Sequence, residues 1–186
     1  MSLTMSVPRA TLADLARVGG KAELVAGTVV PIMPTGYRPG IIAGRIFRRL
    51  ADYADVPGRG TAFGDNVGFA VPTLSTGRES FSPDAAYYTG PAPANEMRFV
   101  PGPPDFAAEV RSEKDYGPAA EAALAAKRAE YFEAGTLVVW DVDPVAGIVR
   151  RHHGGGTPPV AFGIGQDADA EPAVPGWRLS IDWLMA

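Results

Sequence analysis

The chain has 186 residues, of which 46% are hydrophobic and 20% are charged, and its formal net charge is −4. A chain of this length can enclose one substantial core, and nothing in its composition requires a second domain, so we expect a single α/β domain over residues 10–186. The negative net charge argues against broad binding to nucleic acid but allows a local basic strip. Cysteine is absent, which excludes disulfides, thiolate metal ligands and a cysteine nucleophile.

The ends and the hydropathy of the chain predict where it resides. No apolar run approaches the roughly 20 residues needed to span a bilayer, and the N-terminus lacks the basic and apolar segments of a signal peptide. We therefore expect a cytoplasmic protein without a membrane partner. Residues 1–9 are expected to be disordered or left over from an expression vector, because a second methionine, Met5, follows closely on Met1.

Patterns in the first half predict two helices, a hairpin and two strands. A capping threonine predicts a short helix over 11–18, and two apolar runs around an Ala-Gly turn predict a hairpin over 22–32. Apolar residues recur at helical spacing between 39 and 55, which predicts a long helix. Segments 60–71 and 79–88 are rich in Phe, Val and Tyr and are expected to be strands.

The second half predicts a strand, a helix and then further strands. Charged and apolar residues alternate over 105–111, which is typical of a strand, and Pro118 and Gly135 are good boundaries for a helix over 118–134. Apolar runs at 137–140, 148–150 and 177–181 are expected to be strands. Glycine and proline collect in stretches that we expect to be loops: 31–40, 72–77, 90–104 and 154–176.

Glu109 is the first candidate functional residue. Because side chains alternate along a strand, Glu109 and Arg111 project from the same side of segment 105–111. Glu109 has apolar neighbours, and burying an isolated carboxylate is too costly, so we expect this carboxylate to be exposed, paired or bound to a cation.

Asp84 and Lys127 complete a candidate site. An Asp on one strand and a Glu on another can hold a hard divalent cation, because Mg²⁺ accepts one or two carboxylates and keeps waters as its other ligands. Asp84 and Glu109 are such a pair. Lys127 shares a helix face with Leu124 and Tyr131, so it is predicted to point inward, whereas Glu130 is predicted to face water. There it could orient a water or offset charge on a phosphate undergoing hydrolysis.

Six segments, taken in order and spacing, resemble the Uma-two family of the PD-(D/E)xK restriction-endonuclease-like superfamily: 22–30, Pro83-Asp84, 109–112, 127–135, 139–144 and 175–179. The resemblance extends over about residues 10–186. It implies a restriction-endonuclease-like core with a central mixed β-sheet flanked by helices and preceded by an N-terminal hairpin.

The family resemblance also implies roles. Asp84 and Glu109 correspond to metal ligands, Lys127 to the catalytic lysine, and Glu23 to an additional acidic residue at the site. We expect the first three side chains to converge in one cleft, with Glu23 at its edge. Mg²⁺ or Mn²⁺ is the implied cofactor and DNA the implied substrate. Arg111 stands where the superfamily usually has its lysine. It keeps the positive charge but cannot act as a proton carrier, because its guanidinium stays protonated.

Lys114 is a rival for the role of Lys127, because it also follows Glu109 in the chain.

Two functions are compatible with these residues. One is a metal-dependent endonuclease acting on DNA; the other is a catalytically inactive nuclease fold that serves as a dimeric interaction or nucleic-acid-binding module. A small-molecule-binding α/β protein has no motif to support it. We expect a homodimer, because a nuclease that cuts both strands commonly presents two sites.

The remaining conspicuous side chains have ordinary structural explanations. His152 and His153 are adjacent on a predicted strand and point in opposite directions, so we do not expect a metal pair. The three tryptophans are expected in the core or at a dimer contact. Four basic residues lie together at 150–153, and the first long predicted helix contains three arginines: Arg45, Arg48 and Arg49. We interpret both groups as charged side chains exposed to solvent.

Overall fold

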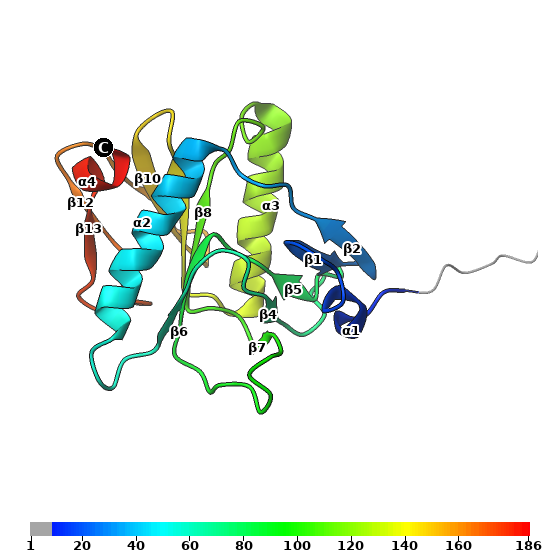
Figure 1. Ribbon diagram of the computed structural model, residues 1–186. Helices are drawn as coiled ribbons and strands as arrows, with labels where there is room; N and C mark the ends of the chain where they lie inside the picture. Colours follow the sequence, from blue (N-terminus) through cyan, green and yellow to red (C-terminus); the bar gives the residue numbers. More distant parts are fainter. Residues whose placement is uncertain (1–8) are drawn as a thin grey trace, which may run out of the picture.

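A six-stranded mixed sheet forms the centre of the protein in the computed structural model, which describes residues 9–186 (Figure 1). The neighbouring strands, in order across the sheet, are β11 (Val160–Phe162), β10 (Ile148–His153), β9 (Val138–Asp143), β8 (Phe106–Val110), β6 (Ala85–Tyr88) and β3 (Thr61–Phe63). Only the β8–β9 pair within this sheet is parallel among the described residues. The mixed sheet flanked by helices confirms the predicted fold class. Apart from residue 9, the predicted N-terminal tail lies outside the described residues.

Helix α3 (Pro118–Ala134) connects the two parallel strands and has the predicted boundaries. Parallel neighbours require a crossover connection, and a helix is the usual one. Pro118 occupies the first turn, where its missing N–H costs nothing. Gly135 ends the helix with a φ of 109°, in the left-handed region that favours glycine, and its N–H bonds back to the last turn.

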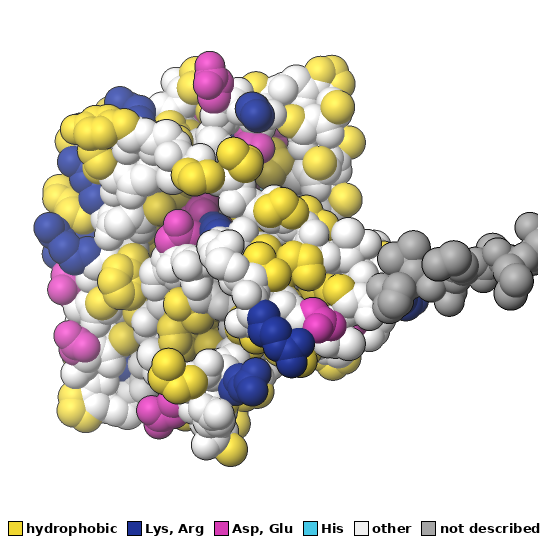
Figure 2. All heavy atoms as spheres, turned by 45° about the vertical axis from the view of Figure 1, so that its right-hand side comes forward, with side chains coloured by type: hydrophobic (Ala, Val, Ile, Leu, Met, Phe, Trp, Pro, Cys, Tyr) yellow, Lys and Arg dark blue, Asp and Glu magenta, His cyan; other side chains and the backbone are white. Residues whose placement is uncertain are grey.

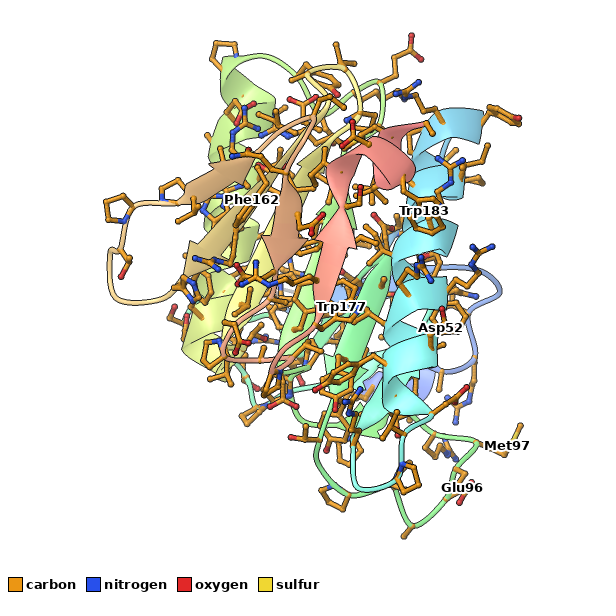
Figure 3. The ribbon with its side chains drawn as sticks, turned by 90° about the vertical axis from the view of Figure 1, so that its left-hand side faces the viewer. Asp52, Glu96, Met97, Phe162, Trp177 and Trp183 are labelled. Atoms are coloured by element: carbon orange, nitrogen blue, oxygen red, sulfur yellow. The ribbon has the colours of Figure 1, made fainter. Side chains whose placement is uncertain are left out.

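The face of the sheet opposite α3 is covered by α2 (Tyr37–Ala54). The predicted apolar stripe of this helix, Ile42, Ile46 and Leu50, is fully buried against the sheet. A hairpin and a short helix extend the same layer (Figure 3): β12 (Asp167–Asp169), β13 (Arg178–Ser180) and α4 (Ile181–Met185).

A hydrophobic core lies on each face of the sheet, and β8 contributes side chains to both in the alternation that its sequence predicts. Phe106, Ala108 and Val110 pack in the core beneath α2, whereas Ala107 packs with Tyr131 of α3. Glu109 therefore emerges on the α3 side of the sheet, where it bonds to that helix.

The N-terminal elements lie beside α3 (Figure 1). Thr11 and Asp14 form the reciprocal capping box of α1 (Leu12–Leu15). The predicted hairpin is formed by β1 (Ala22–Val25) and β2 (Thr28–Pro31). A small second sheet contains β5 (Ser80–Phe81), β4 (Phe69–Ala70) and β7 (Val100–Pro101). The N–H of Glu79 bonds to Leu24 at 2.9 Å, which ties β1 to this small sheet.

Several strand predictions were wrong in detail. Segments 60–71 and 79–88 are each interrupted, so Asp84 lies between β5 and β6 and not in the middle of a strand. Pro83 cannot donate a ladder hydrogen bond, which explains the break before Asp84. Strands β7, β11 and β12 occur within stretches expected to be loops, because two or three residues are too few to produce a periodic pattern.

Figure 2 shows the face that includes the N-terminal elements, where acidic and basic side chains lie side by side near the middle among neutral and apolar ones. Within residues 9–186, no helix has the length and apolar character needed to cross a membrane.

Candidate active site

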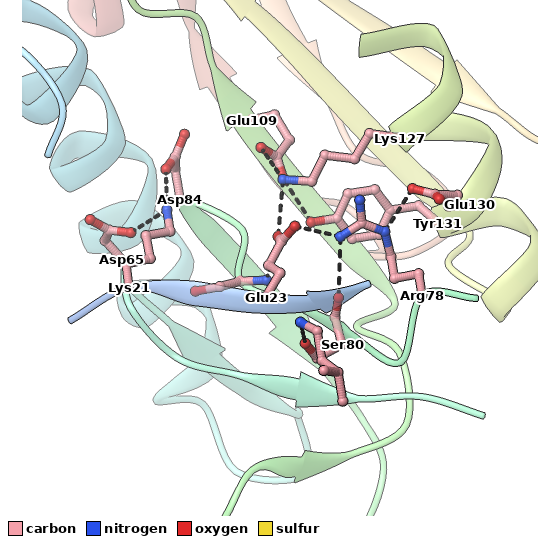
Figure 4. Close-up of polar contacts among 12 residues, drawn as sticks. Lys21, Glu23, Asp65, Arg78, Ser80, Asp84, Glu109, Lys127, Glu130 and Tyr131 are labelled. Carbon is pink, nitrogen blue, oxygen red and sulfur yellow. Dashed lines mark hydrogen bonds and ion pairs between the residues drawn. The ribbon is translucent and has the colours of Figure 1, made fainter. Parts of the chain in front are cut away.

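Lys127 is the meeting point of three elements on the α3 side of the sheet (Figure 4). Its Nζ lies 2.9 Å from Oε1 of Glu109 on β8 and 3.2 Å from Oε1 of Glu23 on β1. Tyr131, one helical turn further along α3, donates its hydroxyl hydrogen to Oε1 of Glu109 at 2.6 Å. The predicted inward orientation of Lys127 is thus observed, and the lysine joins two carboxylates from different strands.

Asp84 is placed beside the end of β8 by the strand register. Ala85 pairs with Ala108, and the backbone N–H of Asp84 bonds to the carbonyl of Ala108 at 3.1 Å. Continuing this antiparallel register places Asp84 opposite Glu109, on the same sheet face. The Asp84 carboxylate accepts the backbone N–H of Val110 at its Oδ2, at 2.8 Å.

Lys21 neutralises the other oxygen of Asp84. Its Nζ lies 2.7 Å from Oδ1 of Asp84 and 2.6 Å from Oδ1 of Asp65. The Lys21 side chain is only 14% exposed. The acidic site therefore contains two lysines: Lys21 at Asp84 and Lys127 at Glu109.

Glu23 lies deeper than the edge position expected for it, because Arg78 draws it into a buried network. Its Oε2 bonds to Nη1 of Arg78, and its Oε1 accepts the N–H of Ser82 at 3.0 Å. Nε of Arg78 lies 2.6 Å from Oε2 of Glu130 on α3. The prediction that Glu130 faces water was wrong: it is 7% exposed. The helix face of Lys127 extends to position 130, and Arg78 supplies the partner that makes burial tolerable.

The electrostatic surroundings fix the protonation of Lys127. Burial alone would lower the pKa of its ammonium group, but the adjacent carboxylates of Glu109 and Glu23 outweigh burial and raise the pKa above its ordinary value. Burial also raises the pKa of the Tyr131 phenol, and the Glu109 carboxylate adds to this effect. Both groups therefore act as hydrogen-bond donors near neutral pH and not as bases.

The pKa values of the two glutamates shift in opposite directions, although burial acts on both in the same way. Burial raises the pKa of Glu109, and the carboxylates of Asp84 and Glu23 reinforce that shift against the pull of Lys127. Burial also acts to raise the pKa of Glu23, but Lys127 and Arg78 outweigh it, so the pKa of Glu23 is lowered. Glu23 is thus held as an anion, whereas a further cation would stabilise the charged form of Glu109.

The donor set fits a hard divalent ion. Within residues 9–186, no three acidic, histidine or cysteine side chains form a metal site by themselves. Mg²⁺ does not require such a set, because it binds through one or two carboxylates and retains waters. Asp84 and Glu109 would be those ligands, and a cation would offset the burial, and the repulsion from Asp84 and Glu23, that together raise the pKa of Glu109.

Neither rival cation occupies the place of Lys127. Arg111 lies on the α3 side, as predicted, but its Nε and Nη2 are each 2.7 Å from an oxygen of Asp141, and it also pairs with Glu121. This guanidinium is 5% exposed and fully engaged in a structural ion pair. Lys114 is exposed, and no ion pair found within residues 9–186 includes it.

Two site residues escaped sequence reasoning. Lys21 stands two positions before Glu23, and the strand period that places both on one side was a usable signal. Arg78 follows the turn at Gly77 and gave no signal, because its partners Glu23 and Glu130 are 55 and 52 positions away.

Comparisons with known proteins concern the family and the fold of the chain. The family model for Uma2, described as a putative restriction endonuclease, matches residues 10–182. The crystal structure of a putative nuclease from Anabaena variabilis is similar with a TM-score of 0.72 and 17% sequence identity, over 94% of this chain and 97% of that chain. At such low identity the structural match establishes the fold alone. A comparison with curated proteins found no match.

Proposed function

The chain belongs to the Uma2 family, and from this membership we propose that it is a divalent-metal-dependent endonuclease that hydrolyses DNA phosphodiester bonds. The observation that carries the proposal is the contact of Lys127 with Glu109, at 2.9 Å, on the sheet face that also bears Asp84. A lysine and two acids in this relation are the groups that phosphodiester hydrolysis needs.

Asp84 and Glu109 are proposed to hold Mg²⁺ or Mn²⁺. The bound ion would polarise a phosphate oxygen and lower the pKa of an attacking water. The protein's part is to keep the two carboxylates in place. Val110 fixes Asp84 through its backbone N–H, and Tyr131 fixes Glu109 through its hydroxyl.

Lys127 is proposed to stabilise negative charge on the phosphate. Its raised pKa keeps the ammonium protonated, so it donates hydrogen bonds and does not accept the proton of the attacking water. Glu23 also contacts the ammonium, at 3.2 Å, and Arg78 in turn holds Glu23. The proposal therefore gives Glu23 and Arg78 positioning roles.

Cleavage of plasmid DNA at low salt with Mn²⁺ or Mg²⁺ tests the proposal. We expect slow cleavage by the wild type and none by Asp84→Asn or Glu109→Gln, because each variant removes one metal ligand. Lys127→Ala should retain metal binding while losing most of the rate. Glu113→Gln, at an exposed acid outside the site, is the matched control and should cleave normally. If the wild type and the variants give equal cleavage rates on DNA and on RNA, with or without the metal ion, the proposed nuclease activity is refuted.

The alternative is a catalytically inactive nuclease fold that serves as a dimeric interaction or nucleic-acid-binding module. The ion pairs of Lys21 with Asp84 and of Lys127 with Glu109 favour it, since they balance the acidic charges without a metal ion. This module would bind no Mn²⁺ at the acids.

We infer a homodimer for the nuclease, because two sites related by a twofold axis suit cleavage of both strands. The alternative function is likewise that of a dimeric module. Light scattering at micromolar concentration should give twice the monomer mass of 19.5 kDa; a monomer alone would contradict the dimer.

A further inference from the structure

A pocket separate from the acidic site lies on the sheet face opposite Glu109, between α2, β13 and α4. Its volume is about 270 Å³, and six of its lining residues matter here: Arg49, Asp52, Tyr53, Trp177, Arg178 and Trp183. Figure 3 shows Trp177 where β13 begins and Trp183 on α4, both on the side of α2. The whole sheet separates this pocket from the acidic site, so it needs an explanation of its own.

Positive charge is concentrated around Trp183. The guanidinium carbons of Arg45, Arg48 and Arg49 lie 5.6, 5.1 and 4.8 Å from the centre of its ring. Arg178 adds a further guanidinium at the pocket wall. In a chain with a net charge of −4, this is a local excess of positive charge.

Part of this charge is free to bind a ligand. Arg45 is already engaged, because its Nη1 donates to the carbonyls of Leu184 and Ala186 at 3.0 and 2.8 Å. Arg49 has one weak partner, Asp52, at 3.4 Å. Arg48 and Arg178 are exposed, and neither is in any ion pair found within residues 9–186. Arg48 and Arg178 can therefore accept an anion without breaking an ion pair, and Arg49 can do so by giving up its long contact with Asp52.

The aromatic walls are held in place. Nε1 of Trp177 donates to the carbonyl of Arg49 at 3.1 Å, and the hydroxyl of Tyr53 donates to the carbonyl of Pro175 at 2.8 Å. Trp183 is half-buried and packs against the core beneath α2. The pocket thus has rigid apolar walls, with positive charge at its rim.

We propose that this pocket binds one nucleotide unit of single-stranded DNA. The base lies against Trp183, and the flanking phosphates bind Arg48, Arg49 and Arg178. Guanidinium groups form paired hydrogen bonds with phosphate, and bases stack on aromatic side chains irrespective of their sequence. The exposed carboxylate of Asp52 can accept a hydrogen bond from the amino group of a base.

Pocket size and shape favour a single strand over other occupants. A volume of about 270 Å³ is just below the usual range for small-molecule sites, which suits one base with part of its sugar. In a duplex the bases are paired and stacked, so their faces cannot reach Trp183. The pocket contains no proposed metal ligand, and binding therefore requires no divalent ion and does not depend on the proposed catalytic activity.

Fluorescence anisotropy with a labelled strand of about 12 nucleotides, at low salt and in excess EDTA, tests this site. The wild type and Glu113→Gln, at an exposed acid outside both sites, should bind equally. The double variant Arg48→Ala/Arg178→Ala should bind about tenfold more weakly or worse. Arg17→Ala, whose side chain is 76% exposed, is the control for lost positive charge and should change affinity less than about twofold.

A further arm separates base stacking from phosphate binding. Trp183→Leu should weaken binding, and Trp183→Tyr should restore part of it, with thermal unfolding used to show that both variants are folded. An abasic strand and the matching duplex should both bind more weakly than the intact strand. Equal binding of the abasic strand, of the duplex or of the double arginine variant would overturn the proposal, as would an absence of binding by the wild type.

Discussion

The ammonium nitrogen of Lys21 lies 2.7 Å from Oδ1 of Asp84, so a proposed metal ligand already carries a tethered cation. Burial alone would lower the pKa of Lys21, but Asp84 and Asp65 outweigh it and the pKa is raised, which keeps the lysine charged. A metal ion at Asp84 must compete with this charge.

Replacing Lys21 with methionine should therefore strengthen metal binding. We expect the affinity for Mn²⁺ to rise by about tenfold, equivalent to about 1.4 kcal/mol, because Lys21→Met removes the competing cation and keeps the apolar stem. Titration calorimetry measures this change. Lys114→Met, at an exposed lysine, should leave the affinity unchanged. Weaker binding by Lys21→Met would mean that Asp84 does not bind the ion.

Arg78 should be important for stability. Arg78→Leu leaves the buried carboxylates of Glu23 and Glu130 without their shared partner, and breaking such a network typically costs about 3–5 kcal/mol. Urea denaturation should show a loss of about 3 kcal/mol in the free energy of unfolding. Arg78→Lys should recover only part of it, because an ammonium cannot bridge both carboxylates as the planar guanidinium does. A loss below about 1 kcal/mol would contradict the network's role.

The raised pKa of Lys127 predicts how cleavage depends on pH. The lysine stays protonated well above neutral pH, so the cleavage rate should show no loss attributable to its deprotonation between about pH 7 and 9. Lys127→Arg should retain part of the rate because it preserves the positive charge, whereas Lys127→Ala should not. A rate that rises with an apparent pKa belonging to Lys127, and that Lys127→Arg abolishes, would instead identify this residue as a base.

His152 should make the protein sensitive to acid. Its Nε2 is buried and has no hydrogen-bond partner within residues 9–186, and burial, with the nearby Arg128 charge, lowers its pKa from 6.5 to about 4. Between these values the unfolded chain takes up a proton that the folded protein does not, so stability falls as pH decreases. Because the ring is partly exposed, the loss should remain below about 3 kcal/mol.

Unfolding free energies at pH 7.5 and pH 4.5 test this prediction. His152→Phe should lose less stability between the two pH values than the wild type, because the phenyl ring cannot take up a proton. His153→Phe is the control and should behave as the wild type does. An identical pH dependence for His152→Phe and the wild type would contradict the assignment.

Strong local signals made much of this site predictable from sequence. The two-residue alternation of β8 placed Glu109, and the helical spacing of Leu124 and Tyr131 placed Lys127 on the inner face of α3. Arg78 could not be found in this way, because its contacts join a turn to a strand and a helix far away in the chain. The same long-range contacts explain why Glu130 was wrongly expected to face water.

Titration calorimetry with Mn²⁺ on the wild type and on Glu109→Gln tests the central claim most directly. The wild type should bind the ion, Glu109→Gln should lose that binding, and Glu113→Gln should retain it, because only Glu109 belongs to the proposed metal site. Equal Mn²⁺ binding by all three proteins, or binding by none, would contradict the claim that Asp84 and Glu109 form the metal centre of a nuclease.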